Sequence, residues 1–278
     1  MIKIPDIYRN NDTIYHYTST ENVLQFILKN KKLRFSPRKQ SSDPIENTKE
    51  FISYSGNKDG KINLKAKEVS EFVKKEIEKT KQLCFCKNNI IKDEEHIFNI
   101  SIEKYGFLKP RMWDIYGDRY KGVCLAFSLK ALQNKTKFTN IVDDNIDYLT
   151  FDMISQNHQS FNVPEIIRTK QNDNFNKYLK LNIKRLFNKH IDYRDENEYR
   201  FCSFSDTQYD FVDISDALVG LFVSDIGMNN YLKDSLFDAI QEFKQADMFT
   251  ISWGNLNPSI HNYKKDLDLF NDFFKTEN

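Results

Sequence analysis

Two glutamates and one arginine alternate along the segment Tyr193–Phe201, at positions Glu196, Glu198 and Arg200. Side chains at alternate positions of a strand point to one face, so these three groups share a face if the strand begins by Glu196. Three charged groups on an apolar strand are costly to bury unless they are paired or used in chemistry. The pattern therefore has two interpretations: a carboxylate site with a nearby arginine, or a solvated loop that leads into an edge strand.

A histidine far upstream is the second candidate. His16 lies near the end of a strand predicted over Thr13–Tyr17. Ser19 or Thr20 then caps a helix whose apolar residues follow at helical spacing. A lone histidine is more often structural than functional, so His16 alone does not define a site.

The composition limits the classes of function. The chain has 278 residues, 40% of them hydrophobic, which is enough for a substantial core. With 41 basic and 40 acidic side chains the net charge is +1. The net charge therefore gives no overall electrostatic attraction to nucleic acid or to an anionic membrane, although it is compatible with a local basic groove.

The four cysteines lie in apolar, strand-like runs. Cys84-Phe85-Cys86 has no CxxC or histidine partner nearby, so we expect buried free thiols and no zinc site. Free thiols fit a reducing cytoplasm. The first residues contain no apolar signal-peptide region, and no apolar run reaches transmembrane length, so a cytoplasmic location without membrane insertion is expected.

The predicted elements favour one α+β domain over residues 1–278, with a central mixed or antiparallel sheet flanked by helices. Gln82–Cys86 and Gly122–Phe127 are apolar without alternation and predict central strands. A long helix is predicted over Pro164–His190, with Lys184, Arg185 and Lys189 on a solvated basic face. Further strands are predicted at Lys32–Pro37, Ile141–Thr150, Glu196–Arg200, Phe211–Val212, Leu218–Val223 and Met248–Trp253, and helices at Leu64–Thr80, Pro110–Gly117 and Asn229–Phe243, with a weakly helical tail over Pro258–Asn278. GxGxxG, GxxxxGK[ST], GxSxG and HExxH do not occur in the sequence, which disfavours the enzyme classes that use them.

Short motifs along residues 13–204 resemble DUF2971, a bacterial family of uncharacterised proteins; the segment 216–278 adds a strand and helices. The motifs that carry the resemblance are Tyr15-His16-Tyr17-Thr18-Ser19, Leu33-Arg34-Phe35-Ser36, Asp43-Pro44-Ile45-Glu46, Cys84-Phe85-Cys86, Met112-Trp113-Asp114-Ile115-Tyr116, Gly122–Phe127, and Tyr193 with Glu196, Glu198 and Arg200. Cys86 departs from the serine of the family's central strand.

The order of these motifs also resembles, more distantly, ADP-ribosyltransferases. That resemblance implies an ADP-ribosyltransferase-like fold with NAD as the substrate. His16 would contact the nicotinamide-side ribose, Glu198 would stabilise the oxocarbenium-like transition state, and Glu196 would orient or deprotonate the acceptor. Residues implied to bind NAD are His16, Tyr17, Thr18, Arg34, Phe35, Tyr116 and Arg200.

Two assignments within that site stay open. The aromatic residue that stacks on nicotinamide is Tyr17, Phe35 or Tyr116. Arg34 or Arg200 pairs with the pyrophosphate, but Arg200 has the competing role of an ion pair with Glu196 or Glu198 that keeps both acids ionised.

The resulting hypothesis is an ADP-ribosyltransferase or NAD glycohydrolase that acts on a protein or nucleic acid acceptor, a type that suits a toxin or an anti-phage defence effector. One alternative is a non-catalytic module that binds a nucleotide or a partner through the same cleft. A second alternative is a nucleic-acid-binding protein, which requires a contiguous basic groove.

Overall fold

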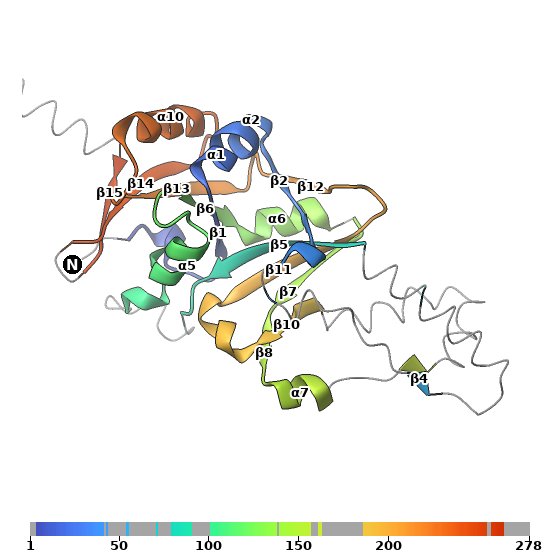
Figure 1. Cartoon of the computed structure of the whole chain (residues 1–278). Coiled ribbons are helices and arrows are strands. Elements are labelled where there is room, and N and C mark those ends of the chain that lie inside the picture. Colours follow the sequence, from blue (N-terminus) through green and yellow to red (C-terminus); the bar gives the residue numbers. More distant parts are fainter. Residues whose placement is uncertain are drawn as a thin grey trace, which may run out of the picture.

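The computed structural model describes residues 4–41, 43, 54–55, 71, 79–90, 101–137, 139–156, 161–162, 186–254 and 257–263. Strands and helices intermingle along this part of the chain, and the fold is α+β (Figure 1). The predicted turn at Asp43–Glu46 and the predicted helix at Leu64–Thr80 lie almost wholly outside the described residues. Thr80 itself begins a strand.

A mixed sheet forms the centre of the fold, in the strand order β15-β14-β13-β6-β1-β5-β11-β7, with β3 pairing beside β5. Its pairings are antiparallel except for the parallel pair β13–β14. β5 and β6 both lie inside the sheet, which confirms the prediction made from their apolar runs. The strands are β1 (Thr13–Thr18), β3 (Ser36–Pro37), β5 (Thr80–Lys87), β6 (Val123–Ser128), β7 (Ile141–Asn145), β11 (Glu198–Phe204), β13 (Leu218–Ser224), β14 (Asp247–Ser252) and β15 (Ser259–Asn262).

Three short strand pairs lie outside this sheet. β2 (Lys32–Arg34) pairs with β12 (Phe211–Asp213), β8 (Asp147–Leu149) pairs with β10 (Asn188–His190), and β4 (Tyr54–Ser55) pairs with β9 (Phe161–Asn162). The strands predicted over Lys32–Pro37 and Ile141–Thr150 are therefore each divided between two partners. In the first, β2 pairs with β12 and β3 pairs with β5. In the second, β7 pairs with β11 in the central sheet and β8 pairs with β10 outside it.

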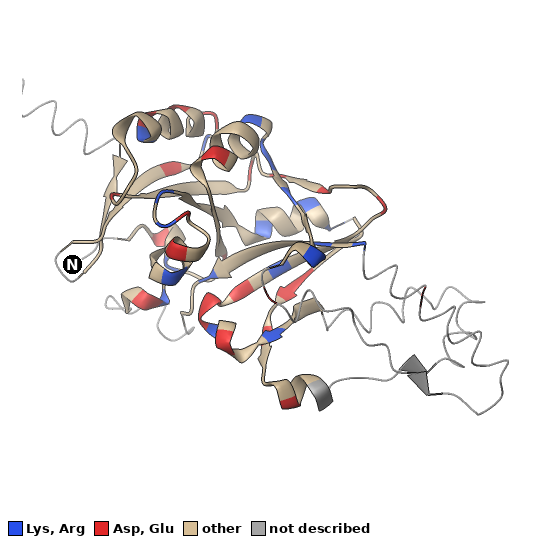
Figure 2. Ribbon diagram, viewed as in Figure 1, with Lys and Arg blue, Asp and Glu red and all other residues tan. Residues whose placement is uncertain are grey.

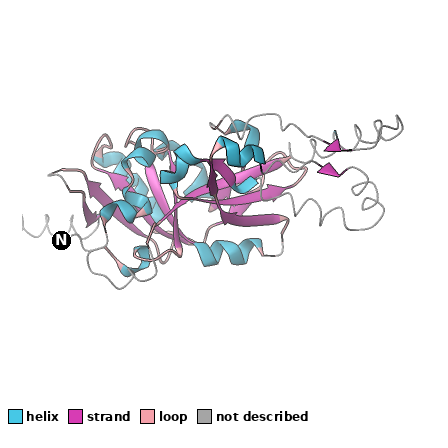
Figure 3. Cartoon of the chain, turned by 90° about the horizontal axis from the view of Figure 1, so that it is seen from below, coloured by secondary structure: helices cyan, strands magenta, loops and turns pink. Residues whose placement is uncertain are grey.

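Helices cover both faces of the strands (Figure 3). Ser19 caps the first helix through its hydroxyl, as predicted. Asn229 caps α10 through its side-chain carbonyl oxygen, which accepts from the Leu232 amide. Within the described residues no helix has the length and apolar character needed to span a membrane. The helices are α1 (Thr20–Asn22), α2 (Leu28–Asn30), α5 (Pro110–Ile115), α6 (Leu129–Thr136), α7 (Phe151–Gln156) and α10 (Asn230–Ile240), a π-helical turn η2 (Val23–Ile27), and the 3-10 turns η1 (Asp6–Tyr8), η3 (Arg38–Gln40), η5 (Ile102–Lys104), η6 (Gly106–Leu108) and η8 (Ile191–Glu196).

The two faces of the sheet bury separate apolar cores. Ile14 and Phe85 belong to one core, which α6 and α10 cover through Leu132 and Leu236. Tyr15, in the next position along β1, belongs to the other core, which η6 and α5 cover. Because successive strand residues point to opposite faces, a strand buried on both sides must be apolar throughout, as β6 is.

The sheet splits between β1 and β5. β1 pairs with β6 from Thr13 to Thr18, but it pairs with β5 only at Ile14 and Tyr15. β5 continues to pair with β11 along its whole length on the other side. The two halves of the sheet therefore separate at His16, and the site described below lies where they part.

Two predicted helices are corrected. Asn188–His190, the end of the helix predicted over Pro164–His190, forms strand β10, while residues 163–185 lie outside the described part. In the predicted helical tail, Ser259–Asn262 forms strand β15 against β14, and residues 264–278 lie outside the described part. In both places strand pairing outweighs the local helical pattern: β10 pairs with a strand far upstream, and β15 pairs with the strand that precedes it in sequence.

Gly122 stands where two backbone segments approach closely. A Cβ atom there would lie 2.3 Å from the Thr18 carbonyl oxygen and 2.8 Å from the Gly117 backbone. We expect Gly122→Ala to lower the free energy of unfolding by about 1–3 kcal/mol, because neither obstacle is a movable side-chain end. Urea denaturation measures the change. Gly254→Ala, whose added methyl meets nothing within 4 Å, is the control; equal midpoints for the two variants would refute the steric account.

Candidate functional site

A cavity of about 350 Å³ opens where β1 and β5 part. We call it the inner cavity. Among the described residues, β1, β5, α5, β10 and the η8–β11 segment all contribute side chains to its wall. The lining residues are Tyr15, His16, Tyr17, Gln40, Ser41, Gln82, Cys84, Phe85, Cys86, Met112, Tyr116, Lys189, Glu196, Glu198 and Arg200.

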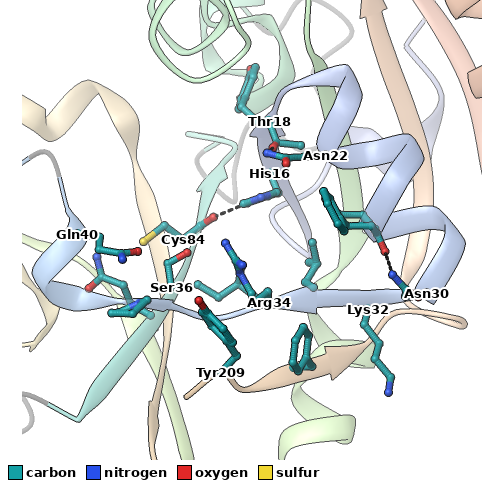
Figure 4. Close-up of a pocket in the computed structure, with 18 of the residues that line it drawn as sticks. His16, Thr18, Asn22, Asn30, Lys32, Arg34, Ser36, Gln40, Cys84 and Tyr209 are labelled. Atoms are coloured by element: carbon teal, nitrogen blue, oxygen red, sulfur yellow. Dashed lines mark hydrogen bonds between the residues drawn. The ribbon is translucent and has the colours of Figure 1, made fainter. Parts of the chain in front are cut away.

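His16 bridges the split in the sheet. Its Nδ1 lies 3.0 Å from the Cys84 carbonyl oxygen (Figure 4). Its ring packs edge-on against Phe85. Because a carbonyl only accepts hydrogen bonds, Nδ1 carries the proton and Nε2 is left as an acceptor. Burial lowers the pKa of His16 below 6.5, although the bond to Cys84 opposes this shift. The imidazole is therefore neutral at pH 7.

Lys189 joins the two glutamates. Its Nζ lies 2.6 Å from Glu196 Oε2 and 3.2 Å from Glu198 Oε2, and all three side chains are buried. The Tyr116 hydroxyl donates to the other oxygen of Glu196 at 3.1 Å. The lysine thus holds two carboxylates together that would otherwise repel each other.

Arg200 completes this group and is fully buried. Its Nε donates to Glu198 Oε1 at 2.6 Å, and one terminal nitrogen donates to the Leu186 carbonyl oxygen at 2.7 Å. Of the two roles left open for Arg200, the structure therefore has the ion pair. Lys189, Glu196, Glu198 and Arg200 form what we call the charge cluster, and its two positive and two negative charges balance.

Glu198 and Lys189 keep their charges at neutral pH. Burial alone would raise the pKa of Glu198, but the charges of Arg200 and Lys189 outweigh it and lower that pKa to about 2. Burial alone would lower the pKa of Lys189, but Glu198 and Glu196 together raise it above its ordinary value. An ionised carboxylate in a water-poor cavity can stabilise positive charge that develops on a bound molecule.

A left-handed turn, and not strand alternation, brings the glutamates together. Glu196 is the last residue of η8, and β11 begins only at Glu198. Between them Asn197 has φ +46°, a backbone conformation that asparagine tolerates. Its side-chain amide donates to the Asn88 backbone carbonyl oxygen at 2.8 Å. The expectation that Glu196 lies in the strand is therefore wrong.

A second cavity of about 800 Å³ adjoins the first, and we call it the outer cavity. The two share His16, Tyr17, Gln40, Ser41, Gln82 and Cys84. Arg34 stacks over the Tyr209 ring at 4.8 Å, and its side chain points toward His16 and Cys84 (Figure 4). No acidic residue is among the described residues that line the outer cavity.

The predicted site residues divide between the two cavities. The inner cavity takes His16, Tyr17, Tyr116, Glu196, Glu198 and Arg200, and the outer cavity takes Thr18 and Arg34 along with His16 and Tyr17. The predicted role of Phe35 as a site residue is corrected. Phe35 is fully buried in the apolar core and lines neither cavity.

Of the remaining candidate stackers, Tyr17 is fixed by a bond from its hydroxyl to the Gly106 carbonyl oxygen, at 2.6 Å, and by edge contact with Trp113. The hydroxyl of Tyr116 is held by Glu196, and its side chain packs against the apolar core that contains Trp113.

Lys189 and Tyr148 are site residues that the sequence analysis missed. Lys189 was placed on a solvated helix face, yet it lies on β10 inside the charge cluster. The Tyr148 hydroxyl accepts a bond from the Glu198 amide at 2.8 Å. The signal for Lys189 lies in the charge balance of the site. If two glutamates are buried with one arginine, a second cation is needed nearby to neutralise them.

The structure thus defines an α+β protein whose central sheet is split around a charged cavity. The model of the family described as "Protein of unknown function (DUF2971)" matches residues 112–201, which supports the family resemblance over that segment. The matched segment carries Tyr116 and the whole charge cluster but not His16. No curated protein and no solved structure matches the chain. Within the described residues no group of histidine, cysteine and acidic side chains could hold a metal ion.

Proposed function

We propose that the protein binds NAD and breaks the bond between nicotinamide and ribose, as ADP-ribosyltransferases do, passing ADP-ribose to a macromolecule or to water. One observation carries the proposal: a neutral histidine and two glutamates, one of them held ionised by its ion pairs, line a single cavity at the split in the sheet.

The charge distribution along the two cavities supports this choice of substrate. The inner cavity holds carboxylates, which favour the positive nicotinamide ring and the cationic ribose that forms from it. Arg34 reaches from the outer cavity toward the shared boundary, where it can pair with the pyrophosphate. NAD combines a cationic end with an anionic centre. The inner cavity offers the cationic end two carboxylates, which Lys189 and Arg200 balance, and the outer cavity offers the anionic centre Arg34.

Each side chain then has a role. The bond between the ring nitrogen and the ribose carbon breaks, and its electron pair leaves with nicotinamide. Glu198 stabilises the positive charge left on the ribose, and His16 Nε2 accepts a hydrogen bond from a ribose hydroxyl. The acceptor then forms a new bond to that ribose carbon, and Glu196 takes the proton that the acceptor loses. Tyr17 or Tyr116 stacks on the nicotinamide ring.

A non-catalytic nucleotide-binding module is the second candidate, and one observation favours it. Both oxygens of Glu198 already accept from cations, at 2.6 Å from Arg200 and at 3.2 Å from Lys189. A carboxylate neutralised in this way serves structure as readily as catalysis. Incubation of the protein with NAD, with free nicotinamide measured over time, separates the candidates. Binding of NAD without release of nicotinamide would replace the enzyme with the module.

We expect His16→Asn to slow nicotinamide release by about five- to tenfold, the value of one hydrogen bond of roughly 1 kcal/mol. Asparagine can keep the donor to Cys84 while it removes Nε2, so the melting temperature should change little. His261→Asn, on the exposed face of β15, is the matched control. A slowed reaction in both variants, or in neither, would contradict the assigned role of His16.

A further inference from the structure

Three aromatic side chains stand exposed around the outer cavity. Phe26 is 56% exposed, Tyr209 39% and Phe211 54%, and all three line that cavity. We call them the aromatic rim. They come from η2, from the loop before β12 and from β12 itself. Large apolar side chains gathered at a cavity mouth indicate a binding surface for a ligand or a macromolecule.

The charges around the rim are of one sign. Between residues 22 and 42 the sequence has six basic residues and no acidic one. Lys31 pairs with Glu242 and Arg38 is buried, but Lys29, Lys32, Arg34 and Lys39 are exposed. Lys32 and Arg34 line the cavity, and basic residues follow β2 and the short helix after it (Figure 2). A local basic groove therefore exists although the net charge is +1.

The loop that carries Tyr209 is anchored in place. The Asp210 carboxylate accepts from the Ser203 hydroxyl at 2.6 Å, the Thr207 hydroxyl at 2.6 Å and Lys81 Nζ at 3.2 Å. The Asp210 carbonyl oxygen accepts from the Phe35 amide at 2.8 Å. Tyr209 is thus presented on a loop that is already ordered, which lowers the entropic cost of stacking a ligand on it.

We propose that the outer cavity binds single-stranded nucleic acid, with bases stacked on the aromatic rim and phosphates paired with Lys32 and its exposed basic neighbours. Aromatic platforms beside cations are what unpaired strands bind, because every base offers a stacking face and every nucleotide a negative charge. A duplex hides the faces of its bases and fits the rim poorly. Binding of a strand here does not require NAD cleavage. Because Arg34 is also assigned to the pyrophosphate of NAD, the strand and NAD meet at this residue, and the strand lies next to the inner cavity.

Fluorescence anisotropy tests the proposal, with a labelled single strand of about 12 nucleotides as RNA and as DNA, and with the duplex of the same sequence. We expect both single strands to bind more tightly than the duplex. Tyr209→Ala and Phe211→Ala should each weaken binding by about tenfold. Tyr231→Ala, at a tyrosine 78% exposed on α10 that lines neither cavity, should leave it unchanged. Tighter binding of RNA than DNA would mean that the 2′-hydroxyl is also read.

The salt dependence tests the phosphate contacts. Lys32→Gln should reduce the slope of log affinity against log salt by about 0.7, the contribution of one phosphate contact in a single strand. Lys130→Gln, on the exposed face of α6, should not. The proposal is overturned by absence of binding at low salt, by equal binding of single strand and duplex, or by wild-type affinity in both rim variants. Nicotinamide release is measured separately, so its failure leaves this result interpretable.

Discussion

Replacement of Glu198 by glutamine is expected to reduce nicotinamide release by at least about a hundredfold. The amide keeps the volume of the side chain but loses the charge that stabilises the cationic ribose in the transition state. The loss should appear in the rate of the chemical step and much less in the affinity for NAD, which isothermal titration measures.

The same substitution also unbalances the charge cluster. Glu198 lies 2.6 Å from Arg200 and 3.2 Å from Lys189, so Glu198→Gln leaves two buried cations facing one anion. We expect the free energy of unfolding to fall by about 3–5 kcal/mol. Activity must therefore be measured below the melting transition of the variant and normalised to folded protein.

A second change separates catalysis from stability. Adding Lys189→Met to Glu198→Gln removes one positive charge with the negative one and leaves one anion, Glu196, and one cation, Arg200, in the cluster. Stability should then recover in part, since the remaining charges balance, while nicotinamide release stays at least about a hundredfold below that of the wild type. Glu103→Gln, an exposed glutamate in η5, should affect neither property. Activity that returns together with stability in the double variant would make Glu198 a structural anchor and not a catalytic group.

Local signals in the sequence predicted much of the fold. The apolar runs of β5 and β6 and the hydroxyl cap of Ser19 each act within a few residues. The separation of the sheet at His16 has no such signal, because it depends on which residues of β1 stop pairing with a strand far along the chain.

The misplacement of Lys189 has the same origin. The short strand Asn188–His190 is too brief to show alternation, and the lysines and apolar residues before it follow a helical spacing. Its parallel pairing with Asp147–Leu149 is non-local. The two glutamate partners of Lys189 are near in sequence, but they come within reach only because the chain turns at η8 before β11 begins. Phe35 failed as a stacker for a related reason. β2 and β3 turn toward different partners on either side of it and leave its ring in the core.

Replacement of Lys189 by methionine is expected to lower the free energy of unfolding by about 3–5 kcal/mol. Methionine fills a similar volume, so the loss is electrostatic: Glu196 loses its ion pair with Lys189, and the cluster keeps two buried carboxylates but one cation. Urea denaturation at neutral pH measures the change. Lys130→Met, at an exposed lysine on α6, should stay within about 0.5 kcal/mol of the wild type.

The acid limb of the stability curve gives a stricter test. The pKa of Glu198 is about 2 in the folded protein against 4.5 ordinarily, so its ionised form stabilises the fold above pH 4.5. That contribution, about 3 kcal/mol, is lost as the pH falls from 4.5 toward 2. In Lys189→Met one of the charges that lowers this pKa is gone, so the variant should lose less stability over the same interval.

The basic limb has the opposite sign. The pKa of Lys189 is raised in the folded protein, so its charge stabilises the fold below pH 10.5, and the contribution is lost as the pH rises through the folded value. The wild type should therefore lose the contribution of Glu198 at acid pH and that of Lys189 at basic pH, with a broad plateau between them. The free energy of unfolding of Lys189→Met should vary less with pH. Identical acid limbs for wild type and variant would mean that Lys189 does not hold Glu198 ionised. The ionised glutamate on which the proposed chemistry depends would then rest on Arg200 alone.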